Sequence, residues 1–378
     1  MSAYIARRLL LMIPTLIGIM LISFVIVQFA PGGPVERVLA QLQGSDNSAT
    51  SRFSGSAGGD LGVGAQPGAA GLSSDPISSK YRGAQGLDPE FVKSLEKQFG
   101  FDKPAPERFL LMMWNYLRFD FGESYFRDVS VVSLIIEKMP VSISLGLWMT
   151  LISYGISIPL GISKAVRDGS RFDVWTSGVI VVGYAIPGFL FAILLIVLFA
   201  GGSFFSVFPL RGLWSDEYSR MTLLEWLLSP RAMLDYAWHM ALPLAAMTIG
   251  AFATTTLLTK NSFLDEIRKQ YVQTARMKGL TENQVLYRHV FRNAMLILIA
   301  GFPGTFIGAF FTGSLLIETI FSLDGIGLLG FESVVNRDYP VVFATAYIFG
   351  LMGLLVGLIS DLTYTWIDPR IDFESREV

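Results

Sequence analysis

Few residues of this chain could carry out chemistry, and those few lie far apart. It has two histidines, His239 and His289, and no cysteine. His239 lies in a long charge-free stretch and His289 in a basic segment that follows it, so we expect them on opposite faces of a membrane. A histidine-paired serine hydrolase or a zinc site needs such groups to converge. The spacing argues against an intramembrane hydrolase and favours an interfacial position for His239 over a role as a metal ligand.

Carboxylates are also missing from the middle of the apolar stretches. Glu318 and Asp361 lie just beyond the ends of two of them, whereas proton relays lie deep within the membrane. Neutral groups remain, and threonine in a membrane helix commonly bonds to its own backbone or to a neighbouring helix. The candidates for lining a transport path are Gly183, Pro187, Thr254 and Thr255.

The chain also lacks a nucleotide-binding signature. No segment fits the G-x-x-x-x-G-K-[ST] pattern of a phosphate-binding loop. We therefore expect no ATP hydrolysis by this chain and no metal or cofactor of its own. If it moves a solute actively, the energy must come from a separate protein.

The elements that must position these residues are apolar and long. The chain is 52% hydrophobic and 16% charged, with a mean hydropathy of +0.51, and a membrane span needs about 20 residues with few charges. This composition predicts an all-α integral membrane protein with six transmembrane helices. The spans are expected within 9–30, 139–163, 174–210, 236–259, 293–317 and 339–360, with one helix and an apolar loop in 174–210.

The ends of these stretches indicate an orientation. The segment 9–30 is longer than the apolar region of a signal peptide, which is about 7–15 residues, and is interpreted as an anchor. Lys and Arg are concentrated before it, around 164–171 and between 260 and 292. Because basic loops stay inside, both termini are predicted to be cytoplasmic.

The long outer segment, 31–138, divides into two parts. Residues 44–86 are rich in Gly, Ser and Ala and are predicted to be flexible. Helices are predicted at 89–99, which starts at a proline, and at 106–118. The apolar face of the second helix, which includes Trp114, fits either a packed core or the membrane interface.

The basic segment between 260 and 292 has strong local signals. A capping-box pattern predicts one helix starting at Ser262 and ending at Gly279, and Thr281 with Gln284 predicts a second. Two short helices joined by a tight turn would present a rigid basic surface; attraction of a basic loop to lipid headgroups is the alternative.

The same segment carries a family pattern. YVQTARMKG at 271–279, followed by RHVFRNA at 288–294, resembles the E-A-A-x-x-x-G signature of ABC importer permeases, in the form of the oligopeptide and dipeptide branch. Gln273, Thr274 and Ala275 take the E-A-A positions, without the glutamate, and Gly279 takes the glycine. RRLLLMIPTLIG, PGGP, FDFGESYFR and WIDPRIDFE extend the resemblance along nearly the whole chain.

The resemblance implies one half of a heterodimeric permease of the type I importer fold in the bacterial inner membrane. A second permease, a cytoplasmic ATPase that binds ATP and Mg, and a periplasmic substrate-binding protein would be its partners. The substrates would be peptides or peptide-like compounds, and members of this branch are associated with uptake of the antibiotic microcin C. The ATPase-coupling residues would be Tyr271, Gln273, Thr274, Ala275, Arg276, Lys278 and Gly279.

The expected organisation follows from this assignment. Residues 1–30 hold the first span, 31–138 form the periplasmic segment, 139–366 form a five-helix core with the coupling loop at 261–293, and 367–378 form a cytoplasmic tail. A channel or scaffold that works without ATP is the alternative from another class.

Overall fold

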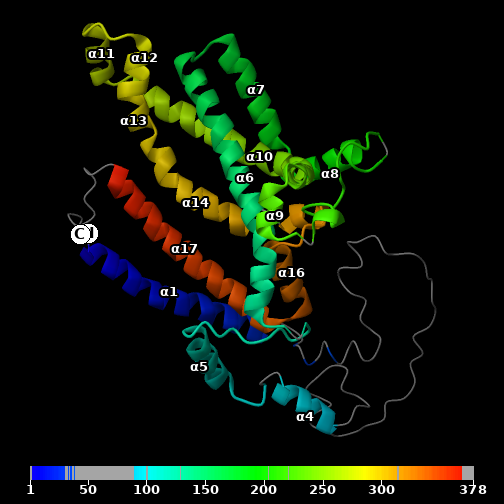
Figure 1. Ribbon diagram of the computed structural model, residues 1–378. Coiled ribbons are helices and arrows are strands. Elements are labelled where there is room, and N and C mark those ends of the chain that lie inside the picture. The colour runs from blue at the N-terminus through cyan, green and yellow to red at the C-terminus, as the bar shows by residue number, and fades with distance from the viewer. Residues whose placement is uncertain are drawn as a thin grey trace, which may run out of the picture. The chain divides into compact units, whose positions relative to one another are not determined.

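The computed structural model describes residues 2–29, 33, 35, 38, 89–98, 101–127, 129–202, 204–219, 221–312 and 315–367. These residues are largely helical, with one isolated bridge between Glu123 and Ser130 (Figure 1). The predicted flexible segment 44–86 and the tail 368–378 lie outside the described residues. The chain divides into two compact units, one made of 1–13, 136–329 and 349–378 and the other of 14–135 and 330–348.

In the described part of the chain, four helices are long and apolar enough to cross a membrane by themselves. They are α1 (Ser2–Phe29), α6 (Val131–Val166), α10 (Pro230–Ile267) and α17 (Tyr339–Ile367). Two bent helix pairs also pass this test, which gives up to six spans if each pair is one span. Each of the six predicted stretches therefore contains a helix or a bent helix pair.

The predicted stretch 174–210 is not a single helix followed by a loop. It forms α7 (Arg171–Ala185) and α8 (Gly188–Phe199), which meet at an angle of 93°. Ile186 is extended, with φ −84° and ψ 118°, because the ring of Pro187 disfavours a helical conformation in the preceding residue. Pro187 also lacks the N–H that a continuing helix would need.

The stretch 293–317 is broken as well. The chain passes from α12 (Glu282–Val285) through the π-helical turn η2 (Leu286–Val290) and α13 (Phe291–Ala294) into α14 (Leu296–Thr312). The axis bends by 48° between Ala294 and Leu296. The short helices η1 (Asp216–Tyr218) and α9 (Leu223–Leu228) precede α10, and α15 (Leu315–Ile320) and α16 (Ile326–Asn336) precede α17.

Helix α6 starts before the charge-free stretch that predicted it. Its first turns contain Glu137 and Lys138, and Lys138 is buried. The Lys138 ammonium pairs with Asp324 and lies 2.8 Å from a carboxylate oxygen of Glu137. Because a paired charge is less costly to bury than an isolated one, the helix can extend past the boundary set by composition.

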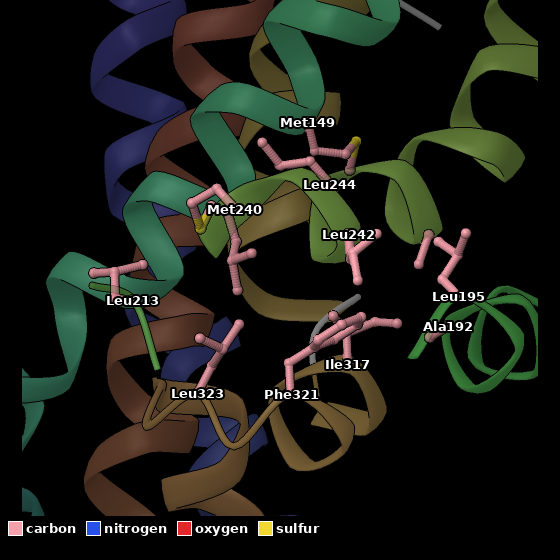
Figure 2. Packing of buried hydrophobic residues seen from close by; sticks show 12 residues of the cluster. Met149, Ala192, Leu195, Leu213, Met240, Leu242, Leu244, Ile317, Phe321 and Leu323 are labelled. Carbon is pink, nitrogen blue, oxygen red and sulfur yellow. The ribbon is translucent and has the colours of Figure 1, made fainter. Parts of the chain in front are cut away.

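The core of the first unit is an apolar cluster shared by α6, α8, α10 and α15 (Figure 2). Met240 on α10 and Leu145 on α6 are almost fully buried within it. Beside this cluster lies Glu318, also fully buried, which accepts a hydrogen bond of 2.7 Å from the backbone N–H of Leu328. The labelled members in Figure 2 are Met149, Ala192, Leu195, Leu213, Met240, Leu242, Leu244, Ile317, Phe321 and Leu323.

The second unit contains α4 (Pro89–Gln98) and α5 (Ala105–Tyr116), close to the predicted 89–99 and 106–118. Asp338 holds this unit together by accepting hydrogen bonds from the Ser124 hydroxyl and, at 3.0 Å, from the Tyr125 N–H. The apolar face of α5 is largely exposed, with Trp114 at 54%. Phe109 and Met113 of the same face are partly buried, so both the packed core and the membrane interface stay predictions.

Candidate functional site

The segment with the family pattern forms a compact knuckle, defined here as residues 268–295, at the end of α10. The predicted helix start at Ser262 is wrong, because α10 continues without a break to Ile267. The Ser262 hydroxyl instead donates a 2.6 Å hydrogen bond to the carbonyl of Ala294, the last residue of α13. α11 (Gln270–Met277) then begins with Lys269 as its N-cap residue.

The predicted turn at Gly279 is confirmed. Gly279 has φ +78°, the left-handed conformation in which a side chain is strained. Its N–H donates to the carbonyl of Arg276 at 2.9 Å, and the Leu280 N–H donates to that of Ala275 at 3.4 Å. This pair of bonds is the Schellman arrangement that ends a helix at a glycine. The turn sends the chain back along α11.

The second predicted capping box is also present. The Thr281 hydroxyl accepts a hydrogen bond of 3.4 Å from the Gln284 N–H, and the Gln284 side chain accepts one of 3.1 Å from the Thr281 N–H. These bonds satisfy amide groups that have no partner within the helix. They fix the start of α12 directly after the turn.

The capping box gives a prediction about local stability. Thr281→Ala is expected to accelerate amide hydrogen exchange in residues 282–285, by up to roughly thirtyfold, because losing an N-cap costs about 0.5–2 kcal/mol. Exchange measured by mass spectrometry in nanodiscs checks it. Thr222 caps α9 through the same box with Glu225, so Thr222→Ala is the matched control and should affect only α9. Unchanged exchange in both variants would contradict the assignment.

A small apolar core holds the knuckle against the long helices. Phe263 on α10, Val272 on α11 and Val285 on α12 are almost fully buried together. Ile162 and Ala165 of α6 belong to the same cluster. The knuckle therefore packs on both α6 and α10 through a shared apolar core.

Tyr271 links three parts of this region. Its hydroxyl donates a 2.6 Å hydrogen bond to a Glu266 carboxylate oxygen and accepts one of 3.3 Å from the Asn293 side chain. Burial and the adjacent Glu266 carboxylate raise the pKa of Tyr271 to about 12. The phenol therefore stays protonated and remains a donor at neutral pH.

The predicted coupling residues separate into two faces of α11. Ala275 faces the core, and Tyr271 is half-buried against it. Gln273, Thr274, Lys278 and Gly279 are exposed. The Arg276 guanidinium is paired with the Glu282 carboxylate through nitrogen–oxygen distances of 2.9 and 3.1 Å. Met277, which the sequence pattern did not single out, is 87% exposed. Such a surface can dock a protein but offers no catalytic group.

The predicted path residues have different local environments. Thr254 is exposed, and its hydroxyl donates to the Ala251 carbonyl at 3.0 Å, whereas Thr255 is buried. Gly183 lies against the side chain of Ile249 on α10, and Pro187 precedes α8 at the bend. Their role in lining a path stays a prediction.

The two histidines lie on different elements, and their position on opposite membrane faces stays a prediction. His239 is buried on α10, with Nδ1 2.9 Å from the backbone carbonyl oxygen of Asp235. His289 is exposed in η2. Among the described residues, no group of three or more His, Cys, Asp or Glu side chains could hold a metal ion.

Sequence reasoning missed a buried ion cluster beside the knuckle. Lys164 of α6 is fully buried, and its ammonium lies 2.9 Å from a carboxylate oxygen of Asp173 at the start of α7. Lys260 of α10 approaches the other oxygen of Asp173 at 2.7 Å. The sequence did offer one signal, because Lys164 and Asp173 are opposite charges on either side of a turn at Gly169. The participation of Lys260 is visible only in the folded structure.

Known proteins resemble this chain over its full length. Residues 157–373 match the model of the family described as "Binding-protein-dependent transport system inner membrane component". The chain is 69% identical to the "Peptidoglycan transport system permease protein YejB" of Agrobacterium fabrum and 57% identical to the "Inner membrane ABC transporter permease protein YejB" of Escherichia coli O157:H7, in each case over 100% of both chains.

A more distant relative confirms the same family. The "Oligopeptide transport system permease protein AppB" of Bacillus subtilis is 31% identical over 99% of this chain and 100% of its own. The family match, the multi-pass helices and the predicted resemblance agree. The chain therefore belongs to the family of binding-protein-dependent transport system inner membrane components.

Proposed function

We propose that this chain is the permease subunit of an ATP-driven importer for peptides or peptide-like compounds. The observation that carries the proposal is the sequence identity of this chain, over its full length, with permeases named for peptidoglycan and oligopeptide transport. It forms one half of the translocation path beside a second, different permease. A periplasmic binding protein delivers the substrate, and both termini of this chain are cytoplasmic.

The knuckle docks on a separate cytoplasmic ATPase, which binds ATP and Mg. Its geometry supports this role, because the core shared with α6 and α10 holds α11 in place while Gln273, Thr274 and Lys278 remain exposed. Movement imposed on α11 reaches α10 along the chain and through the hydrogen bond of Ser262 to Ala294, and it reaches α14 along the chain through α12 and α13. A rigid element fixed to two long helices can convert ATPase closure into rocking of those helices.

Reconstitution tests the function. The chain is co-expressed with a candidate second permease and ATPase from the same organism, purified in mild detergent and placed in liposomes with a candidate binding protein. ATP-dependent accumulation of a labelled peptide is the expected result. A chain that purifies without any ATPase, and that passes peptide equally well without ATP, would establish the alternative of a passive channel or scaffold.

The substrate class is tested in the same liposomes. Cell-wall-derived peptides, linear oligopeptides and a peptide–nucleotide such as microcin C are offered as competitors to the labelled peptide. Competition by cell-wall-derived peptides is expected, in line with the name of the Agrobacterium relative. Binding of the same compounds to the isolated binding protein shows whether selectivity lies there and not in this chain.

A further inference from the structure

The buried ion cluster joins three helices next to the knuckle. The Lys164 ammonium is surrounded by the carbonyl of Asp173 at 2.9 Å and the hydroxyls of Thr176 and Ser177 at 2.8 and 2.7 Å, besides its ion pair with Asp173. Every one of these partners lies on α7. Lys164 therefore anchors the last turn of α6 to the first turns of α7.

A second set of contacts anchors this pair to α10. The Lys260 ammonium lies 2.7 Å from Asp173 and 3.0 Å from Asp168 in the α6–α7 turn. The Gly169 N–H donates to Asp173 at 3.2 Å. Asp168 is also 3.5 Å from the guanidinium of Arg268, the residue that ends α10 and leads into α11. The chain of charges thus runs from α6 to the base of the knuckle.

Packing beside the cluster is equally close. A Cβ at Gly161 of α6 would lie 2.9 Å from the backbone carbonyl oxygen of Thr256 on α10, so the two helices touch almost backbone to backbone. Ile162 and Ala165 then contribute to the core under α11. In Figure 1 the α6–α7 turn and the pair α11–α12 lie at the same end of this unit.

A contribution to the free energy of folding does not by itself explain such a cluster. A buried ion pair is often no better for folding than an apolar replacement, while removal of one partner leaves a costly unpaired charge. What the cluster does provide is a fixed geometry, because Asp173 and Asp168 each pair with cations from two positions. Elements that share such a cluster resist separate movement.

We infer that Lys164, Asp173, Lys260 and Asp168 form a brace that makes α6 and α7 move together with α10 when the knuckle moves. The inference rests on the proposed function, since it needs an ATPase that moves α11. It extends that function by adding α6 and α7 to the helices that transmit the ATPase movement, which otherwise are α10 and α14. The bend at the end of α7 then leads into α8. These four are positioning residues, and none is expected to touch the substrate.

The test measures distances within this chain in the full reconstituted complex. Because the chain lacks cysteine, spin labels can be attached at introduced cysteines before assembly. One pair, Trp175→Cys on α7 and Asn261→Cys on α10, spans the brace, and both positions are exposed. The distance is measured without nucleotide and with ATP and vanadate. ATP-dependent peptide import by the same complex in liposomes reports whether the ATPase drives this chain.

Four backgrounds are compared: the unaltered chain, Lys260→Met, Lys260→Arg and the control Lys103→Met. Lys103 forms an exposed pair with Glu107 in the second unit. We expect the 175–261 distance to stay constant with nucleotide in the unaltered chain, in Lys260→Arg and in the control. In Lys260→Met it should shift or broaden with nucleotide, and peptide imported per ATP hydrolysed should fall by about fivefold or more.

Asp168→Asn is the milder second variant, because Asp168 is 40% exposed and its loss leaves the Lys164–Asp173 pair intact. It should change the same distance in the same direction. An unchanged 175–261 distance and an unchanged import ratio in Lys260→Met and Asp168→Asn would overturn the brace. Absence of ATP-dependent peptide import by the unaltered complex would overturn the proposed function, and transmission with it.

Discussion

Gly279→Asp is expected to reduce ATP-driven peptide import to background while the protein still inserts into the membrane and assembles its helices. Gly279 ends α11 with φ +78°, and no atom lies within 4 Å of the position that a Cβ would take. The new side chain therefore meets no clash within this chain. The fold should survive the substitution.

Two effects act on the knuckle in this variant. A side chain in the left-handed conformation costs about 1–2 kcal/mol, which weakens the turn between α11 and α12. The added carboxylate also projects from the exposed face, beside Lys278, where the ATPase is proposed to dock. Gly279→Asn separates the two effects, since asparagine tolerates this conformation and carries no charge. It should retain part of the import.

The matched control for this prediction is Gly122→Asp. Gly122 has φ +73° and equally open surroundings, but it lies in the second unit. Membrane yield, ATP hydrolysis and peptide uptake are compared in the same liposomes. Normal uptake by Gly279→Asp, or equal loss in Gly122→Asp, would contradict the coupling role of the turn.

Features with a local cause were predictable from the sequence. The turn at Gly279 and the capping box of Thr281 depend on backbone groups within five residues, and both are present as predicted. The six apolar stretches contain helices for a similar reason. A membrane span needs about 20 apolar residues in a row, and such a run can be recognised directly in the sequence.

Features that depend on distant partners were not predictable. Ser262 matched a helix start, but its hydroxyl bonds to Ala294 on another element, and α10 runs on. The brace depends on Lys260 meeting Asp173, which only the packing of α7 on α10 produces. The bend at Pro187 had a local signal, yet proline is tolerated within membrane helices, and Pro14 and Pro243 remain inside unbroken ones.

Packing of α6 on α10 gives the second large prediction, that Gly161→Val sharply lowers the yield of folded protein and abolishes import. A Cβ at residue 161 would lie 2.5 Å from Cβ of Thr259 and 2.9 Å from the carbonyl oxygen of Thr256. The second of these is a backbone atom and cannot rotate away. Thr259 is also fixed, because it is fully buried and its hydroxyl donates to the Thr255 carbonyl at 2.7 Å.

The helices must therefore separate, and overpacking of this kind costs about 1–3 kcal/mol or more. The effect should spread, since Ile162 of the knuckle core and Lys164 of the brace follow directly on α6. Loss of import in the surviving folded fraction is expected for this reason. The thermal midpoint by fluorescence-detected gel filtration, and uptake per folded complex, measure the two consequences separately.

Gly155→Val is the matched control, on the same helix and with nothing within 4 Å of its Cβ position. It changes the same residue types in α6 and should leave both measurements near those of the unaltered chain. A double variant adds a direct test of the contact. Combining Gly161→Ala with Thr259→Gly removes the closest approach and leaves only that to Thr256, so it should be more stable than the sum of its single variants. Strict additivity of the two changes would show that α6 and α10 do not meet at this point.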